Sequence, residues 1–545
     1  MSTFRRGRLT PFGIPQPARL APSLSTTFVP ALGVQPSVPA LIAPEGSMVS
    51  AQNTWVREGG WEPRYRLAQA GTTSPFSVAV APTGALVYDA VEGGRYDLVA
   101  SAATLSYLDG MVWRPLTYVS GVSNLPPSGG ARDFWFGSSI YLERQDANVL
   151  AFTNGVDPLY VWDGPSNGTG YSTLTGAPIC ADLALFDNRP VCWNIGDLST
   201  SSRLVQRVQW SVRGDIEDWA DIGSGFEDLL DMRGEGTRIF AEEDELILFS
   251  TEEIWRGRKV GLPFVFQFAP VTHELGLPYP RAALQTVAGI FWLGRDRLVR
   301  RLVGGAVTEV GGTIQRDLHA TLQSPDLAFF TWNGALRQLA FWYTTTQGQH
   351  PNRNWTLHID TGQWTPHTFA HTLALGAAYV ATPSSATTWG GLTGTVAAQT
   401  LTYNELLGLG LGQTLTDGVV ASTGTAYALT PSANSDDGQA VLSEWQVPVL
   451  TGERTRQKLV DAVRLEAEGG TNSTLSVVVT TDFGRTVGTE RLLTFDANGS
   501  TVSQYVLHPT AAPGAHLALR FRSSSVSTWR VAGATVEAKL RGRTT

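Results

Sequence analysis

Cysteine and uninterrupted apolar runs are both scarce in this chain of 545 residues. Cys180 and Cys192 are its only cysteines, which excludes a disulfide scaffold and fits synthesis in a reducing cytosol. We expect them to be free, buried thiols. Prolines from Pro11 to Pro22 interrupt the N-terminal stretch, so it is neither a signal peptide nor a transmembrane helix. We therefore expect no membrane insertion.

Catalytic and cofactor signatures are missing as well. The chain has no Walker loop, no Gly-x-Ser-x-Gly motif and no His-Glu-x-x-His motif. His367 and His371 have the spacing that aligns metal ligands on a helix, but their surroundings predict strand and loop. Thr480–Val487 approximates a sialidase Asp-box with Val487 in place of tryptophan, and we interpret it as a hairpin. We predict no catalytic residue, no metal, no cofactor and no enzymatic activity.

Glycine, proline and tryptophan are plentiful instead, with 57, 30 and 17 copies. They indicate an all-β protein with many turns and aromatic-capped strands. Val149–Gly164 illustrates the recurring unit, in which an apolar strand, an Asn154-Gly155 turn and a second strand follow one another. Asn-Gly favours a hairpin because both residues accept the positive φ of tight turns. Similar units recur from about Trp61 to about Asn404.

So many short strands fit a sandwich or a propeller, and a ring of blades protects its own sheet edges better. Blades of about 40–45 residues, with looser loops, would make about six. We predict that residues 45–438 form a β-propeller of about six blades. Residues 439–545 change in pattern and predict a β-sandwich-like C-terminal domain. Residues 1–44 are rich in proline and predict an extended N-terminal arm.

Acidic residues are concentrated in one part of the chain. The net charge of −8 argues against a general nucleic-acid binder. Between Asp215 and Glu253, fourteen acids face only Arg233 and Arg238, so this segment carries −12 and the remainder carries +4. A single segment therefore supplies all of the net acidity.

With these residues in view, the chain resembles the tail nozzle proteins of short-tailed bacteriophages, of the tail tubular protein B and packaged DNA stabilisation protein types. The resemblance runs in the family's order through most of residues 43–302. Its stretches are Ala43–Leu67, Phe152–Gly164, Arg207–Trp219, Leu246–Arg256, Pro263–Phe268 and Gly289–Arg300. The N-terminal arm has no match in this family, and the C-terminal domain matches it only loosely.

The resemblance implies a structural β-propeller protein of the virion tail, made in the cytoplasm of the bacterial host. It implies a homo-oligomeric ring, commonly a hexamer, beneath a head–tail adaptor and beside other tail proteins, with tail fibres as further candidate partners. Such a ring retains the packaged genome and then lets double-stranded DNA pass through its channel without specific binding. No catalytic residues come with the resemblance.

Part of the acidic segment is a candidate lining for such a channel. The alternative is a set of solvated loops. A ring multiplies each charge by the number of subunits, and an acidic wall would repel phosphates rather than hold them. The candidate lining residues are Glu227, Asp228, Asp231, Glu242, Glu243, Asp244 and Glu245.

The arm is a candidate assembly element, with Arg5, Arg6, Arg8 and Arg19 as its cations. These arginines could contact DNA, an acidic neighbour or solvent, and we favour a neighbouring subunit. A carbohydrate-binding or receptor-binding propeller of the tail tip is the main alternative function, with exposed tryptophans as platforms. A glycosidase is a weaker alternative.

Overall fold

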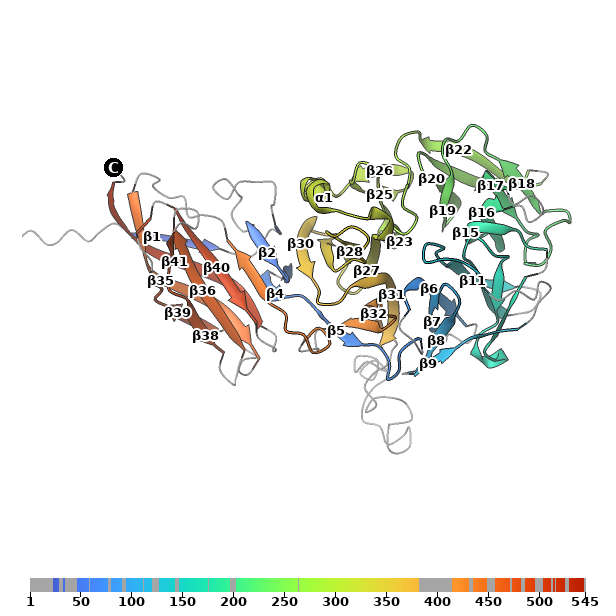
Figure 1. Ribbon diagram of the computed structural model, residues 1–545. Helices are drawn as coiled ribbons and strands as arrows, with labels where there is room; N and C mark the ends of the chain where they lie inside the picture. Colours follow the sequence, from blue (N-terminus) through green and yellow to red (C-terminus); the bar gives the residue numbers. More distant parts are fainter. Residues whose placement is uncertain are drawn as a thin grey trace, which may run out of the picture.

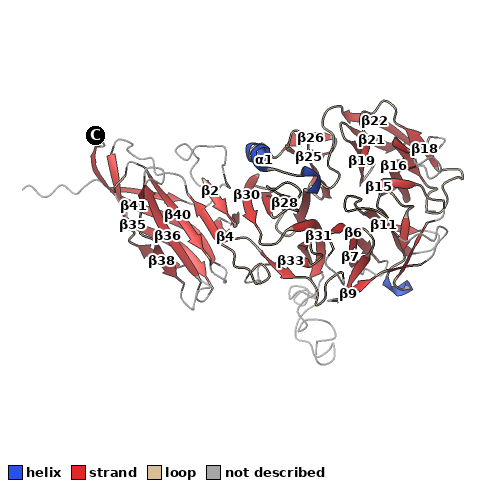
Figure 2. Ribbon diagram, in the orientation of Figure 1, coloured by secondary structure: helices blue, strands red, loops and turns tan. Residues whose placement is uncertain are grey.

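The computed structural model describes residues 23–28, 33–34, 47–57, 59–76, 80–90, 95–110, 112–119, 127–142, 147–174, 176–196, 202–262, 264–381, 414–430, 435–447, 456–470, 473–481, 486–495, 503–510, 513–514, 516–524 and 529–543. Within these residues strands dominate, as Figure 2 shows. The described helical segments are α1 (Gln315–Thr321) and the short 3-10 helices η1 (Pro165–Asn167) and η2 (Pro325–Leu327). Of these, none is long and apolar enough to cross a membrane.

Seven sheets follow one another around a ring and form a β-propeller (Figure 1). The first blade contains β6 (Pro82–Asp89), β7 (Arg95–Ser101), β8 (Leu105–Asp109) and β9 (Val112–Pro115). The second contains β11 (Phe136–Leu142), β12 (Ala147–Thr153), β13 (Tyr160–Trp162) and β14 (Gly170–Thr173), with β10 (Thr117–Tyr118) parallel to β14. The third contains β15 (Ile179–Phe186), β16 (Arg189–Gly196), β17 (Arg203–Trp210) and β18 (Gly225–Asp228).

The remaining blades continue the same antiparallel pattern. The fourth contains β19 (Gly236–Glu242), β20 (Glu245–Ser250), β21 (Ile254–Lys259) and β22 (Phe266–Thr272). The fifth contains β23 (Ala283–Thr286), β24 (Gly289–Leu293), β25 (Val299–Val303) and β26 (Ala306–Glu309). The sixth contains β27 (Phe329–Asn333), β28 (Gln338–Tyr343), β29 (Arg353–His358) and β30 (Gln363–Thr368).

The seventh blade closes the ring with a strand from the other end of the propeller. It contains β31 (Leu373–Ala381), β32 (Thr414–Ala421) and β33 (Ala426–Thr430), and β5 (Arg66–Gln69) pairs with β33 as its outermost strand. The innermost strand β31 contacts β6 of the first blade. The closure therefore joins residues at the start of the propeller to residues at its end, which fixes the ring without a disulfide.

Local sequence explains the hairpins, and apolar side chains explain how the blades stack. Between β15 and β16, Asp187 and Asn188 adopt φ values of 50° and 55°, as a two-residue turn requires. Neighbouring blades share buried cores, and Phe249 of β20 meets Trp292 of β24 with ring centroids 5.3 Å apart. The aromatic residues that end the strands therefore pack between blades rather than face solvent.

Two six-stranded sheets form a second unit to one side of the propeller (Figure 1). One sheet contains β1 (Ser23–Phe28), β3 (Thr54–Arg57), β4 (Gly60–Pro63), β35 (Arg456–Gly469), β39 (Ser503–Leu507) and β41 (Trp529–Arg543). The other contains β2 (Ser50–Gln52), β34 (Ser443–Gln446), β36 (Thr474–Thr481), β37 (Thr486–Val487), β38 (Arg491–Thr494) and β40 (Leu517–Ser523). Trp61, Trp445 and Phe521 are fully buried between the two sheets.

The strand pairings differ from the sequence expectation in two respects. We expected about six blades, whereas seven sheets form the ring. The difference arises because the blades from β19 to β30 have short connections, so each takes fewer residues than we assumed. We also assigned residues 45–63 to the propeller, whereas β2, β3 and β4 pair within the sheets of the second unit. Their apolar residues, Trp61 above all, complete the core between those sheets, and a local pattern of short strands cannot reveal such distant partners.

Candidate functional site

Arg238 of β19 crosses the centre of the propeller. Its guanidinium lies 4.0 Å from the ring centroid of Phe136 on β11, two blades away. Its Nε donates to Asp182 of β15 at 2.7 Å, and its Nη1 donates to the carbonyl oxygen of Pro280 at 3.0 Å. Burial raises the pKa of Asp182, and the charge of Arg238 opposes that rise. One side chain therefore ties together four consecutive blades on their axial side.

Arg281, just before β23, makes a second crossing. Its guanidinium lies 4.5 Å from the ring of Phe134 in the second blade and 5.7 Å from the ring of Phe329 in the sixth. Burial lowers the pKa of Arg281 to about 10, and the charge of Asp326 raises it. Because these blades are not neighbours in the ring, the contacts span its middle. The centre of the propeller is occupied by side chains at this level.

Two cavities open between the blades, and the first includes Phe134, Phe136 and Pro280, which these arginines contact. The first has a volume of about 340 Å³ and lies among the second to fifth blades, with Arg132, Arg203 and Glu235 among its lining residues. The second, of about 600 Å³, lies between the fourth and fifth blades and shares Thr251 with the first. The second cavity is lined by Arg233, Glu252, His273, Glu274, Leu275, Gly276, Arg295, Asp296 and Arg300 in addition to Thr251. Both linings mix cations with anions, which suits a small polar ligand rather than a polyanion.

Ion pairs in which one partner is buried and the other is exposed shape the second cavity. Asp296 binds Arg300, and although burial raises the pKa of Asp296, the hydrogen bonds and charge of Arg300 hold it below its ordinary value. Beneath the cavity, burial would raise the pKa of Glu253, but hydrogen bonds from Trp255 and His273 lower it. These two carboxylates are therefore ionised at neutral pH and are not poised to donate a proton.

A buried polar cluster joins the propeller to the two large sheets. The chain crosses between the two units at Arg64, after β4, and again at Asp436, before β34. The guanidinium of Arg64 pairs with the carboxylate of Asp436, and both side chains are almost completely buried. Arg64 also donates through Nε to Asn53 Oδ1 at 3.0 Å and through Nη2 to the carbonyl oxygen of Thr368 at 2.7 Å. Both crossings are thus held against β30 of the sixth blade.

Asn53 extends this cluster into the large sheets. It adopts a φ of 57°, a left-handed conformation that asparagine tolerates, and its backbone N–H donates to the carbonyl oxygen of Pro366. Its Nδ2 donates to the carbonyl oxygen of Leu442 at 2.8 Å, and the carbonyl oxygen of Asn53 accepts from the hydroxyl of Ser443 at 3.0 Å. Asn53, Arg64, Thr368 and Asp436 together are called the junction cluster below. It fixes the orientation of the two units with groups that cannot be removed singly without leaving polar atoms unpaired.

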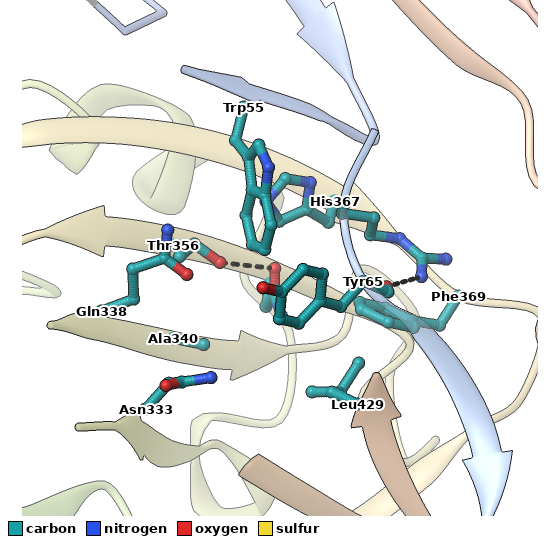
Figure 3. A pocket seen from close by; sticks show the side chains of 11 residues that line it. Trp55, Tyr65, Asn333, Gln338, Ala340, Thr356, His367, Phe369 and Leu429 are labelled. Atoms are coloured by element: carbon teal, nitrogen blue, oxygen red, sulfur yellow. Dashed lines mark hydrogen bonds between the residues drawn. The ribbon is translucent and has the colours of Figure 1, made fainter. Parts of the chain in front are cut away.

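A small cavity lies next to the junction cluster (Figure 3). The sixth blade contributes Gln338, Thr356 and His367 to its lining. The segment that leads from β3 to β5 contributes Trp55 and Tyr65. Its volume of about 30 Å³ is enough for a water molecule or two and for nothing larger. Burial and the charge of Arg64 hold the pKa of His367 well below its ordinary value, so this histidine is neutral at pH 7.

The structure separates the candidate lining residues into two groups. Glu227 and Asp228 lie on β18, the outermost strand of the third blade, with Asp231 just beyond. The second group, 242–245, forms the turn between β19 and β20 of the fourth blade. The chain passes from the end of β18 to the start of β19 on one face of the propeller, so Glu227, Asp228 and Asp231 lie toward that face. The strand β19 then crosses the propeller, and the turn at its end lies toward the opposite face. The sequence could not show this, since it places them within 20 residues of each other.

The local environments of these acids also differ. Asp228 binds Arg207 through both carboxylate oxygens, at 2.7 Å each, and these hydrogen bonds lower its pKa. Burial raises the pKa of Glu227. In the turn, Glu245 binds Arg258, while burial and the charges of Glu245 and Glu243 raise the pKa of Glu242. The ion pair with Arg258 therefore offsets one of the four carboxylates of this turn.

The remaining sequence predictions have mixed outcomes. The expectation of free, buried thiols is confirmed for Cys180 and Cys192, and burial raises the pKa of Cys192. The Asp-box stretch contains the hairpin of β36 and β37, in which Thr480 pairs with Val487. In the described part of the chain, no three His, Cys, Asp or Glu side chains gather as a metal site would need. The arm residues Arg5, Arg6, Arg8 and Arg19 lie outside the described residues.

Comparisons with known proteins give distant structural matches. No protein-family model and no curated protein matches it. Among solved structures it is similar to BBS1N in complex with ARL6DN (TM-score 0.37, 8% identity, 68% of this chain and 99% of that one). It is also similar to the exo-β-1,3-galactanase of Phanerochaete chrysosporium, with a TM-score of 0.27 and 11% identity over 87% of this chain and 100% of that one. The extracellular domain of the putative hybrid two-component system BT4673 of B. thetaiotaomicron matches with a TM-score of 0.36 and 9% identity over 70% of this chain and 44% of that one. These values support no transfer of function.

Proposed function

We propose that this protein is a structural component of a bacteriophage tail that assembles into a homo-oligomeric ring, most simply a hexamer. The observation that carries the proposal is a set of large apolar side chains exposed on the rim of the third and fourth blades. This set, called the apolar rim below, comprises Ile222, Phe226, Leu230, Val260, Leu262 and Phe264. Three of these side chains lie on or beside β18 and three lie in the connection between β21 and β22. Exposed apolar groups that recur along short segments are typical of a surface that is covered in an assembly.

The closed centre of the propeller determines where a channel for DNA would lie. Arg238 and Arg281 fill the middle of each protomer, so a duplex would pass between protomers and not through a propeller. In this proposal, a ring of copies retains the packaged genome and opens for its ejection, with a head–tail adaptor as its neighbour. In this proposal the turn at 242–245 supplies the acidic lining, because Glu227, Asp228 and Asp231 lie next to Phe226 and Leu230 of the apolar rim, which neighbouring copies would cover.

The proposal is also supported by the fixed orientation of the two units and by the stretches that resemble tail nozzle proteins, which occur in that family's order along the chain. A ring under the pressure of packaged DNA needs protomers whose two units keep one orientation. The junction cluster meets that need, since it joins both chain crossings to the sixth blade by a buried ion pair and several hydrogen bonds.

Electron microscopy of the purified full chain, combined with sedimentation, tests the proposal. We expect closed rings with an axial hole and a mass that is a whole multiple of 58.7 kDa. A protein that stays monomeric at every concentration, with or without a tail partner, would reject it.

The two cavities between the blades favour carbohydrate binding as the second candidate. Their volumes of about 340 and 600 Å³ are in the range of small-molecule sites, and their linings offer many hydrogen-bonding groups. Isothermal titration of the chain with oligosaccharides distinguishes this candidate. Saturable binding that is lost in an Arg295→Ala variant, by a chain that forms no rings, would favour it over the structural role.

A further inference from the structure

The outermost strand of each blade presents an open edge unless something covers it. In three blades the edge is covered: β10 pairs with β14, the backbone of Val34 and Asn53 bonds to β30, and Asp437 bonds to β5. No described strand covers the outer edges of β9, β18, β22 and β26. Open edges are the places where a protein accepts another strand.

Among the four open edges, β18 is the one built to accept a partner. The strand β9 ends at Pro115 and β22 contains Pro270, and proline is a common way to blunt an edge. The strand β26 (Ala306–Glu309) contains no leucine and no aromatic residue. In contrast, β18 has no proline, and Phe226 is 56% exposed on it.

Two further apolar side chains flank the edge of β18. Ile222, which precedes the strand, is 89% exposed, and Leu230, which follows it, is 79% exposed. A partner that covers these side chains removes their apolar surface from water, which favours binding. The three residues define an apolar surface that runs along the edge.

The same edge is strongly acidic. Residues 215–231 contain seven acids and no lysine or arginine. Glu217, Asp221, Glu227 and Asp231 are exposed and form no ion pair with a described residue. Arg207 of β17 pairs with Asp228 and stacks on Phe226, and is the one cation that meets the strand directly among the described residues. The surface therefore calls for a partner that is apolar, positively charged and able to extend.

One segment of this chain has that chemistry. Residues 1–22 contain four arginines and no acid, together with Phe4, Leu9, Phe12, Ile14 and Leu20. The first ten residues contain no proline and carry three of the four arginines, so they can pair with the backbone of a strand. The segment ends where β1 begins, and β1 pairs with β41 in the large sheets.

We propose that residues 1–22 of one copy dock on the open edge of β18 in a second copy, with the apolar side chains against Ile222, Phe226 and Leu230. The arginines then lie against the exposed acids of residues 215–231. A second copy is favoured over the same chain because β1 and β18 lie at opposite ends of the molecule (Figure 1). This inference rests on the proposed function, since it supplies the contact that links neighbours in the ring.

A peptide of residues 1–22 with a fluorescent label, titrated with the protein of residues 23–545, tests the contact directly. We expect saturable binding that weakens as salt rises. The double variant F226S/E227K of the protein should bind at least about tenfold more weakly, since it removes an apolar anchor and reverses a charge. Glu309→Lys on the outermost strand of the fifth blade is the matched control and should leave binding within about twofold. Equal binding by both variants, or a peptide that binds duplex DNA and not the protein, would overturn the inference.

A mixing experiment tests whether the contact joins two copies. The protein of residues 23–545 has the edge without the arm, and the full chain with F226S/E227K has the arm without the edge. A mixture of the two should sediment as a larger species than either alone. No association in the mixture would mean that the arm binds its own chain, which contradicts the inference.

The outcomes separate this inference from the proposed function. Rings of the full chain that persist unchanged in F226S/E227K would reject the docking and leave the structural role intact. A peptide that binds the edge of β18 while the full chain never forms rings would reject the structural role and keep the docking. Thermal unfolding of each variant shows whether it has folded.

Discussion

The third and sixth blades have the same four-stranded design but opposite surroundings. In the sixth blade, the outermost strand β30 receives hydrogen bonds from Val34 and Asn53 and is covered by the large sheets. In the third blade, the outermost strand β18 is bare, acidic and flanked by exposed apolar residues. The difference shows that blades of the same four-stranded design can serve as a junction or as an open surface. The residues that lie against the outermost strand determine which role it has.

The interactions at the two edges differ as well. Around β30 the contacts are buried and specific, with Arg64 and Asp436 each less than a few per cent exposed. Around β18 the charges face water, where an ion pair contributes little on its own. The covered edge is therefore a permanent junction, and the open edge suits a contact that forms when copies meet. The predictions below test this contrast, beginning with the covered edge.

Replacing Asp436 by alanine should have the largest effect. The change leaves the guanidinium of Arg64 buried without its partner carboxylate, which typically costs about 3–5 kcal/mol. It also removes the acceptor for the backbone N–H of Leu67 at the start of β5. We expect the free energy of unfolding, measured in urea, to fall by that amount.

The matched control is Asp360→Ala, which removes an ion pair with Arg337 in which both side chains are about half exposed. Exposed pairs contribute roughly 0–1 kcal/mol, so this variant should unfold almost as the parent does. Equal losses in the two variants would contradict the view that the junction cluster holds the units together.

The double variant L262S/F264S should have a smaller effect, and on assembly rather than on folding. Both side chains are exposed in the protomer, so their loss costs little stability. If they lie in an interface, ring formation should need at least about tenfold more protein, as two lost apolar anchors imply. Sedimentation over a range of concentrations measures this, with Val287→Ser as the control because Val287 is at least as exposed but lies outside the apolar rim. Unchanged assembly in L262S/F264S would exclude this part of the rim from the contact.

The contrast also shows which features local sequence can predict. The hairpin at Asn154-Gly155 depends on turn chemistry within a few residues, and its strands pair as expected. The acidity of residues 215–231 is likewise a property of a short segment. Propeller architecture follows from the repetition of such units, so the all-β fold was accessible from the sequence.

Features that depend on distant partners were not accessible. Arg64 and Asp436 are 372 residues apart, and neither stands in a motif that announces an ion pair. Arg238 and Arg281 meet aromatic rings two or more blades away, so nothing nearby in the sequence marks them as axial. The membership of β2, β3 and β4 in the large sheets is hidden for the same reason. Assignments of this kind need the closed ring, because only the ring determines which segments become neighbours.

The smallest effect we predict is a dependence of stability on pH at the covered edge. Burial holds the pKa of His367 well below 6.5 in the folded state, while an unfolded histidine titrates near 6.5. The unfolded state therefore binds more protons below pH 6.5, and stability falls as the pH decreases through that range, by at most about 1.4 kcal/mol per pH unit for one group. Burial and the charge of Arg281 also lower the pKa of His350, which adds a contribution of the same sign.

Urea unfolding at pH 7.5, 6.5 and 5.5 measures this slope, and comparison with His367→Gln isolates the part due to the junction. Glutamine cannot take up a proton, so the variant should lose less stability between pH 6.5 and 5.5 than the parent, even if it is less stable at pH 7.5. His319, in the last turn of α1 and away from the junction, provides the control variant His319→Gln, which should keep the parental slope. Identical slopes in the parent and in His367→Gln would mean that this histidine is protonated in the folded protein. The covered edge would then be wetter than its buried ion pair implies, and its contrast with the open edge of β18 would be one of degree.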